Sequence, residues 1–310
     1  MQSSSWDGLQ LSRLMLGTVQ FGMPYGVANH TGQPTYPEVV RIVAAAFESG
    51  VNCFDTAAAY GTSEEVLGRA LRELKIADHV TVVTKVRPLT AEEAADAATA
   101  ARAIERSVET SRRLLQIDCL PLVLFHRESD AAYLAALESL RARGWIQRCG
   151  VSCDNTPGPA AAFVEARDVS AIQLPGSVVD QRHLQSGVCQ LAQSLGIAVF
   201  IRSVFLQGLL VMKEDEIPIS LRDMIPVRRT LTELAEQAGM TLPELAVRFM
   251  LHQNGVTCVI AGVETVAQVS DNIRLFNDSP LPQDLLFAIS ATAWELPETL
   301  ITPRQWPARL

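Results

Sequence analysis

The chain has 310 residues, of which 48% are hydrophobic and 19% are charged. This composition is typical of a soluble globular protein with a sizeable core, and it excludes intrinsic disorder for most of the chain. The formal net charge is −8, from 26 Lys and Arg against 34 Asp and Glu. That sign is wrong for binding a nucleic-acid backbone or an anionic membrane surface, so we expect neither as a partner.

The sequence shows no sign of membrane insertion or export. No apolar run approaches the roughly 18 residues of a membrane-spanning helix. The first residues, MQSSSWDG, have neither the basic nor the apolar region of a signal peptide, so we expect a cytoplasmic protein. The cysteines have no CxxC spacing, which favours reduced core thiols and no metal site. They are Cys53, Cys119, Cys149, Cys153, Cys189 and Cys258.

Short apolar runs alternate with longer helical patterns along the chain. The predicted strands cover residues 14–18, 51–56, 80–86, 119–126, 148–153, 170–174, 198–204 and 256–263. The helical patterns cover residues 37–49, 63–74, 91–116, 131–143, 158–166, 184–195, 226–253 and 265–276. Several end at a glycine placed just past the last apolar repeat, which suits a left-handed cap: Gly50, Gly144, Gly196 and Gly239. This alternation is typical of βα units around a parallel sheet.

Eight βα units predict an α/β fold with a single (β/α)8 TIM-type barrel over residues 1–310. The GxGxxG motif that opens a doubly wound sheet is absent from the sequence. We expect residues 1–10 to be flexible and residues 277–310 to form a tail over the barrel. The long connection at 207–226 is expected at the barrel mouth or rim, where loops build binding sites.

Candidate catalytic side chains stand where predicted strands end. The active site of such a barrel lies at the C-terminal ends of its strands. Lys85 lies within a strand, where an ammonium group requires a carboxylate partner. Each of these residue types also has common structural roles, such as turn capping for an aspartate. Together, however, they form a set on three consecutive strands and their loops: Asp55, Tyr60, Lys85 and His126.

These residues carry a resemblance to a known family. The segment FDTAAAYGTSE at 54–64 is similar to the Asp-Thr-Ala-x-x-Tyr-Gly-x-Ser-Glu signature of the aldo-keto reductase superfamily. Further matches follow in the family's order and spacing: Thr84-Lys85, His126, Gly150-Val151-Ser152 and Gln173. The segments LGTVQFG at 16–22 and RSVFLQGLL at 202–210 resemble bacterial members of uncertain substrate, some of them associated with sugar metabolism.

The resemblance implies an NAD(P)(H)-dependent oxidoreductase that interconverts an aldehyde or ketone and its alcohol by hydride transfer. It makes Tyr60 the general acid/base, eased by the charge of Lys85, which Asp55 holds in place. It gives His126 the task of orienting the carbonyl. The partner is then a small carbonyl or sugar substrate, selected by the rim loops at 21–36, 207–226 and 294–310.

The resemblance also implies a set of cofactor contacts. Ser152 and Gln173 would bind the nicotinamide carboxamide, and residues 260–272 would surround the adenosine ribose or phosphate. The full set is Ser152, Gln173, Arg202, Ser203, Gly262, Val263, Glu264, Gln268 and Asn272. Two positions depart from the family. Cys153 replaces the usual Asn, whose contact Asp154 or Asn155 could supply, and Arg202 replaces a frequent aromatic residue, although a guanidinium can also stack.

The choice of nicotinamide cofactor depends on two side chains. Glu264 and Gln268 stand where the family usually has Ser, Lys or Arg to hold a 2′-phosphate. A carboxylate repels a phosphate and can accept hydrogen bonds from ribose hydroxyls. The alternative is that Glu264 only caps the next helix and faces solvent. We expect NADP(H) or NAD(H) as cofactor, with NAD(H) at least tolerated.

Two other functions fit the same pattern. The first is a lyase that uses Lys85 as a Schiff-base nucleophile, although an adjacent Asp55 raises the pKa of the amine and argues against it. The second is a non-catalytic subunit that senses nucleotide on the same fold, since a fold alone does not establish activity. A turnover assay on generic aldehydes distinguishes this non-catalytic subunit from an enzyme.

Overall fold

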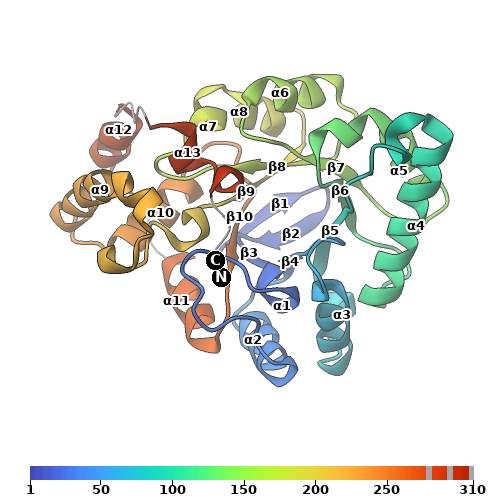
Figure 1. Ribbon diagram of the computed structural model, residues 1–310, viewed down its shortest axis with the longest axis horizontal. Coiled ribbons are helices and arrows are strands. Elements are labelled where there is room, and N and C mark those ends of the chain that lie inside the picture. Colours follow the sequence, from blue (N-terminus) through green and yellow to red (C-terminus); the bar gives the residue numbers. More distant parts are fainter. Residues whose placement is uncertain (277–280, 292–295, 307–310) are drawn as a thin grey trace.

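Eight parallel strands form a closed barrel in the order β10-β3-β4-β5-β6-β7-β8-β9 (Figure 1). The structure is a computed structural model that describes residues 1–276, 281–291 and 296–306. The barrel strands are β3 Leu14–Gly17, β4 Cys53–Asp55, β5 Thr81–Val86, β6 Leu122–Phe125, β7 Cys149–Ser152, β8 Ala171–Pro175, β9 Ala198–Arg202 and β10 Cys258–Gly262. Each overlaps one predicted run, and the predicted (β/α)8 barrel is confirmed.

Helices cover the outer face of the barrel (Figure 1). Helix α2 buries Val39, Ile42, Val43 and Ala46, the spacing of one helical face. The α-helices are α1 Val19–Gly22, α2 Tyr36–Glu48, α3 Ser63–Glu73, α4 Ala97–Leu115, α5 Leu134–Ala142, α6 Pro157–Ala166, α7 Arg182–Gln185, α8 Val188–Ser194, α9 Ile225–Gln237, α10 Leu242–Leu251, α11 Val266–Phe276, α12 Gln283–Ala291 and α13 Glu298–Ile301. Short 3-10 turns are η1 Ala77–His79, η2 Glu93–Ala95, η3 Glu128–Tyr133, η4 Leu206–Gly208, η5 Glu214–Glu216, η6 Ile219–Met224 and η7 Pro303–Gln305.

The helical pattern at 226–253 contains two helices. Helix α9 is followed by Gly239, whose φ of 70° lies in the left-handed region. Helix α10 then begins with a capping box: the Thr241 hydroxyl accepts from the Glu244 backbone N–H, and the Glu244 carboxylate accepts from the Thr241 N–H. The glycine and the capping box together explain why one apolar repeat folds as two separate segments.

A hairpin before the first barrel strand closes the N-terminal end of the barrel. Strands β1 Ser3–Trp6 and β2 Leu9–Ser12 pair antiparallel, which corrects the expectation that residues 1–10 are flexible. The Trp6 side chain is 7% exposed and packs edge-on against Phe200, with ring centroids 6.0 Å apart. Trp6 and Leu11 belong to the apolar cluster that fills the barrel interior, and this burial holds the segment in place.

The opposite end of the barrel is covered in part by the chain after α12. Residues 302–304 line the cavity at this mouth. The predicted tail over the barrel also includes residues 277–280, 292–295 and 307–310, which lie outside the described residues. Within the described ranges, no helix combines the length and the apolar character needed to cross a membrane.

Candidate active site

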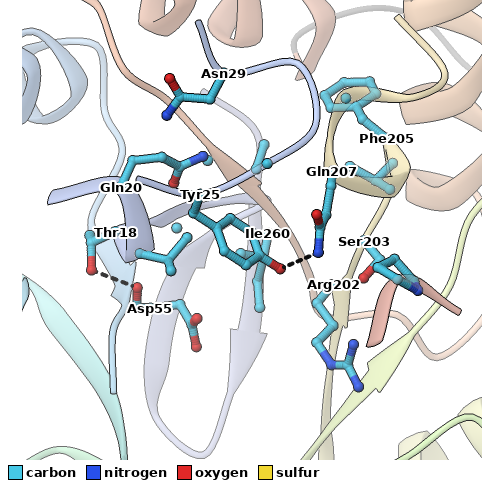
Figure 2. Close-up of a pocket in the computed structure, with 18 of the residues that line it drawn as sticks. Thr18, Gln20, Tyr25, Asn29, Asp55, Arg202, Ser203, Phe205, Gln207 and Ile260 are labelled. Atoms are coloured by element: carbon cyan, nitrogen blue, oxygen red, sulfur yellow. Dashed lines mark hydrogen bonds between the residues drawn. The ribbon is translucent and has the colours of Figure 1, made fainter. Parts of the chain in front are cut away.

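A cavity of about 580 Å³ opens at the C-terminal ends of the barrel strands (Figure 2). The barrel strands contribute their last residues Gly17, Asp55, Ser152, Arg202 and Gly262 to its lining, and β8 contributes Gln173. Loops contribute Tyr25, Asn29, Tyr60, His126 and Gln207. Because the strands are parallel, all these ends meet at one mouth, as the sequence led us to expect.

A buried ion pair lies at the base of the cavity. The Lys85 ammonium donates to Asp55 Oδ1 at 2.7 Å and to the Thr56 carbonyl at 2.9 Å. Lys85 is 1% exposed and Asp55 is 4% exposed. Burial lowers the pKa of Lys85, and the charge of Asp55 opposes this shift. Gln173 Nε2 donates to the same Asp55 oxygen at 2.7 Å, so the carboxylate is held from two sides.

Tyr60 and His126 stand in front of this pair. Their rings are perpendicular, with centroids 5.5 Å apart, and Lys85 Nζ lies 5.1 Å from the centroid of the Tyr60 ring. The structure therefore brings the four predicted catalytic residues together. Asp55, Tyr60 and His126 line the cavity, whereas Lys85 is not part of the lining.

Burial gives Tyr60 and His126 their protonation states. Desolvation and the charge of Asp55 raise the pKa of Tyr60 well above its usual range, while Arg202 and Arg304 oppose the rise. The phenol is thus protonated at neutral pH. Burial, followed by the charge of Lys85 and of nearby arginines, lowers the pKa of His126 to about 3. A neutral imidazole beside a protonated phenol can donate and orient a hydrogen bond to a carbonyl oxygen.

Close backbone packing fixes the loop that carries Tyr60. Gly61 has a φ of 56°, and a Cβ there would lie 2.3 Å from the Gly22 carbonyl oxygen. The Ser63 hydroxyl donates to the Thr18 carbonyl at 2.7 Å. Thr18 Oγ1 in turn donates to the Asp55 carbonyl at 2.9 Å (Figure 2). The small and hydroxyl residues of the 54–64 segment therefore lock Tyr60 against the first βα unit.

Eight of the nine predicted cofactor contacts line the cavity: Ser152, Gln173, Arg202, Ser203, Gly262, Glu264, Gln268 and Asn272. Val263 is the exception, because its side chain is 1% exposed and packs into the hydrophobic core. Gln20 Oε1, which lines the cavity, is buried without a hydrogen-bond partner among the described residues. The polar lining and this orphaned oxygen fit a polar ligand such as a dinucleotide.

Glu264 faces the cavity at the start of α11. Its carboxylate accepts from the Thr31 hydroxyl at 3.3 Å, and its backbone N–H donates to Gln268 Oε1 at 2.6 Å. Asp271 also lines the cavity, so this end carries two carboxylates. Among the described residues, the arginines of the lining are Arg202 and Arg304, and no lysine lines it.

Sequence reasoning missed several lining residues that come from the rim loops. Tyr25 accepts a hydrogen bond from Gln207 Nε2 at 3.1 Å, beside Arg202 (Figure 2). Arg304 forms an ion pair with Asp154. The loops 21–36, 207–226 and 294–310 were expected to carry specificity, but no periodic pattern indicates which loop side chains turn inward.

Cys153, which stands where the resemblance led us to expect Asn, contacts Arg202 through its backbone. Arg202 Nη2 donates to the Cys153 carbonyl at 3.1 Å. Of the two residues considered as replacements for the missing amide, Asn155 lines the cavity. Its Nδ2 donates to Asp180 Oδ2 at 3.2 Å, which fixes the amide at the edge of the site.

Comparison with known proteins supports the resemblance seen in the sequence. The profile of the Aldo/keto reductase family matches residues 13–292. The chain is 25% identical over 307 residues to a probable voltage-gated potassium channel subunit beta from Oryza sativa subsp. japonica, covering 89% of this chain and 90% of that protein. It is also 25% identical over 305 residues to an NADH-specific methylglyoxal reductase from Escherichia coli (strain K12), covering 87% and 91%.

Solved structures share the fold. The holo form of an aldo-keto reductase from Bacillus halodurans has a TM-score of 0.77 and 23% identity, covering 94% of this chain and 97% of that chain. A glycerol dehydrogenase from Gluconobacter oxydans has a TM-score of 0.73 and 24% identity, covering 99% and 98%. With the family profile matched over most of the barrel, the chain belongs to the aldo/keto reductase family.

Proposed function

We propose that the protein is an NAD(P)(H)-dependent oxidoreductase that interconverts an aldehyde or ketone, including sugar-derived carbonyls, with its alcohol. The observation that carries the proposal is the placement of Tyr60 against His126, with the buried Lys85–Asp55 pair behind them. Membership of the family supports oxidoreductase chemistry. Cytoplasmic location and a small-molecule partner stay predictions.

The geometry suits acid catalysis of carbonyl reduction. A nicotinamide bound in this cavity would supply the hydride, and we expect Ser152 and Gln173 to hold its carboxamide. The protonated Tyr60 phenol donates its proton to the carbonyl oxygen as negative charge grows there. His126 orients that oxygen through a neutral imidazole. Arg202 and Arg304 ease the loss of the Tyr60 proton, because both oppose the rise in its pKa.

The test of this proposal is Tyr60→Phe. We expect kcat for a generic aromatic aldehyde to fall by about 10²–10⁴-fold, the usual contribution of a general acid. The Kd for NADH should stay within about threefold, because the hydroxyl acts on the substrate. Tyr36→Phe is the matched control, since the Tyr36 hydroxyl bonds Glu73 at 2.7 Å on the exposed surface. Loss of nucleotide affinity with an unchanged rate would contradict the assignment.

We further propose that NAD(H) is at least tolerated as cofactor. Glu264 and Asp271 give the α11 end of the cavity negative charge, which disfavours a 2′-phosphate. The Escherichia coli relative is an NADH-specific methylglyoxal reductase, which is consistent with this choice. Ribose hydroxyls could instead donate to Glu264, as in other dinucleotide sites.

The cofactor proposal is tested by the ratio of kcat/KM with NADH to kcat/KM with NADPH. Glu264→Ser removes about 1 kcal/mol of repulsion in water, so we expect the ratio to move toward NADPH by about fivefold or more. Glu38→Ser, a surface change on α2, should leave the ratio unchanged. A wild-type ratio strongly favouring NADPH and unmoved by Glu264→Ser would show that Glu264 does not read the ribose.

The two other functions differ in their support. A Schiff-base lyase needs a reachable amine, but Lys85 Nζ is bonded to Asp55 and Thr56 in a side chain that is 1% exposed. A non-catalytic nucleotide-sensing subunit has one observation in its favour, the similarity to a probable channel subunit. Nucleotide binding without turnover of any aldehyde, ketone or sugar would favour that second candidate.

A further inference from the structure

Two arginines stand at the catalytic end of the cavity. Arg202 ends β9 and Arg304 belongs to the η7 turn, and both line the cavity together with Tyr60 and His126. Both guanidinium groups are anchored just after β7, because Arg202 bonds the Cys153 carbonyl and Arg304 pairs with Asp154. This concentration of positive charge stands out in a chain whose net charge is −8.

The negative charge around these arginines does not balance them. Asp55 is neutralised by Lys85. Asp154 pairs with Arg304 but does not line the cavity. Arg202 forms no ion pair with any described residue and bonds the Cys153 carbonyl instead. Among the described lining residues, this end of the cavity thus carries two arginines and an Asp55 already paired with Lys85, whereas Glu264 and Asp271 line the α11 end.

Hydrogen-bonding capacity at the same end is also unused. Thr302 lines the cavity and is 8% exposed, and its hydroxyl has no partner among the described residues. His126 Nδ1 is likewise buried and unpartnered within the described part of the chain. Buried polar groups in proteins normally form hydrogen bonds. The unpartnered Thr302 hydroxyl and His126 Nδ1, in a cavity that also holds two guanidinium groups, therefore indicate a polar ligand.

The segment that carries Arg304 is held in place. Arg182, at the start of α7, bonds Glu298 at 3.1 Å and Asp180 at 2.8 Å, which ties α13 to the barrel. The Asp154 carboxylate holds the Arg304 side chain itself. A guanidinium fixed in this way presents its remaining N–H groups in a fork that matches a carboxylate or a phosphate.

We propose that the cavity selects carbonyl substrates that carry an anionic group, a carboxylate or a phosphate, bound by Arg304 together with Arg202. The inference rests on the proposed carbonyl oxidoreduction and names the substrate class for it. The alternative use of these arginines is to hold a phosphate of the cofactor. We favour the substrate, because both arginines line the same cavity as Tyr60 and His126, the two side chains proposed to meet the carbonyl.

The experiment compares aldehydes that differ only in charge. 4-Carboxybenzaldehyde and 4-formylphenyl phosphate are the anionic probes, and methyl 4-formylbenzoate is the neutral one. We measure kcat/KM for each, and we measure binding of 4-carboxybenzaldehyde and of NADH by titration calorimetry. The variants are Arg304→Gln, the conservative Arg304→Lys, and Arg229→Gln as the control. Arg229 is an exposed arginine on α9 that pairs with Glu214.

Wild type should prefer at least one anionic aldehyde over the ester by about tenfold or more, the value of a charge-assisted hydrogen bond. The anionic aldehyde with the larger gain in kcat/KM over the ester shows whether the site prefers a carboxylate or a phosphate. Arg304→Gln should lose most of this preference and weaken calorimetric binding of the carboxylate, Arg304→Lys should keep part of both, and Arg229→Gln should behave as wild type.

Three results would overturn the inference. Turnover of the ester with no preference for either anion refutes it and leaves the proposed oxidoreduction intact. A tenfold loss of NADH affinity in Arg304→Gln with the anion preference retained would assign the arginine to the cofactor. Equal binding of the carboxylate by wild type and Arg304→Gln also refutes it. If no aldehyde is reduced, calorimetry still decides the anion site, while the oxidoreductase proposal fails separately.

Discussion

The acidity of one phenol, that of Tyr60, depends on charges from distant parts of the sequence. The family resemblance assigns Lys85 to ease the loss of the Tyr60 proton. In the structure the Lys85 charge is compensated by Asp55 at 2.7 Å. Burial and Asp55 raise the pKa of Tyr60, and the cations that oppose this rise are Arg202 and Arg304. We therefore expect Lys85 to hold Asp55 as much as to act on the phenol.

Lys85→Met tests that double role. The change leaves Asp55 buried without its counter-charge, which typically costs about 3–5 kcal/mol of unfolding free energy. We also expect kcat to fall by about 100-fold or more, because the carboxylate next to Tyr60 then further raises the pKa of the phenol. Urea unfolding and steady-state kinetics are the measurements.

Lys213→Met is the control for this prediction, because the Lys213 side chain is 80% exposed and should move neither quantity. Normal turnover by Lys85→Met would show that Lys85 has only a structural role and that other groups determine the pKa of Tyr60.

The cluster of Asp55, Tyr60, Lys85 and His126 could be predicted from the sequence because these residues lie at or near strand ends. Asp55 and Tyr60 belong to one short motif, and parallel strands bring the strand ends near Lys85 and His126 to the same mouth. Arg304 and Tyr25 could not be predicted, because irregular loops have no period that fixes the direction of a side chain. Val263 directly follows β10 and turns its side chain into the core, which the sequence pattern did not indicate.

At the scale of the element, the N-terminal hairpin is the part that sequence reasoning missed. Strand β1 shows no alternation of apolar and polar residues, because it consists of three serines followed by the buried Trp6. The signal that could have revealed it is Asp7-Gly8. These residues have φ values of 46° and 77°, the conformation of a tight two-residue hairpin turn.

The hairpin should contribute to stability through Trp6. Trp6→Ala removes a large side chain from the closed end of the barrel, and we expect a loss of about 3–5 kcal/mol in unfolding free energy. Because the cavity lies at the other end, kcat/KM at a temperature where the variant is folded should change by less than about twofold.

The matched control is Trp145→Ala, which removes a half-buried indole that stacks with Arg112 and Arg143 on the outside of the barrel. Denaturant unfolding should show a clearly smaller loss for this variant. Equal losses of unfolding free energy in Trp6→Ala and Trp145→Ala would mean that Trp6 is not part of a packed core.

At the scale of the whole molecule, buried histidines link folding to pH. Burial lowers the pKa of His126 from 6.5 to about 3, and it also lowers the pKa of His183. The unfolded chain therefore binds more protons than the folded chain between these values. The unfolding free energy should fall as the pH drops from about 6.5 toward 3.

Denaturant unfolding at pH 7.5 and pH 5.0 measures this dependence. His126→Asn should lose less unfolding free energy between the two pH values than wild type does. Asparagine does not titrate, so the unfolded variant no longer gains a proton at this position. His79→Asn, a change at an exposed histidine of η1, should match the wild-type slope. A wild-type slope that survives in His126→Asn would assign the effect to other groups.

The hairpin at the closed end gives the protein a built-in optical reporter. Trp6 lies against Phe200 at the far end from the cavity, and its indole N–H donates to the Gly196 carbonyl at 3.1 Å. Trp6 fluorescence should be insensitive to ligands in the cavity and should change only when the barrel unfolds. Trp306 follows η7, two residues beyond Arg304, and should respond to whatever enters the mouth. With single-tryptophan variants, emission from one end would record unfolding and emission from the other would record binding.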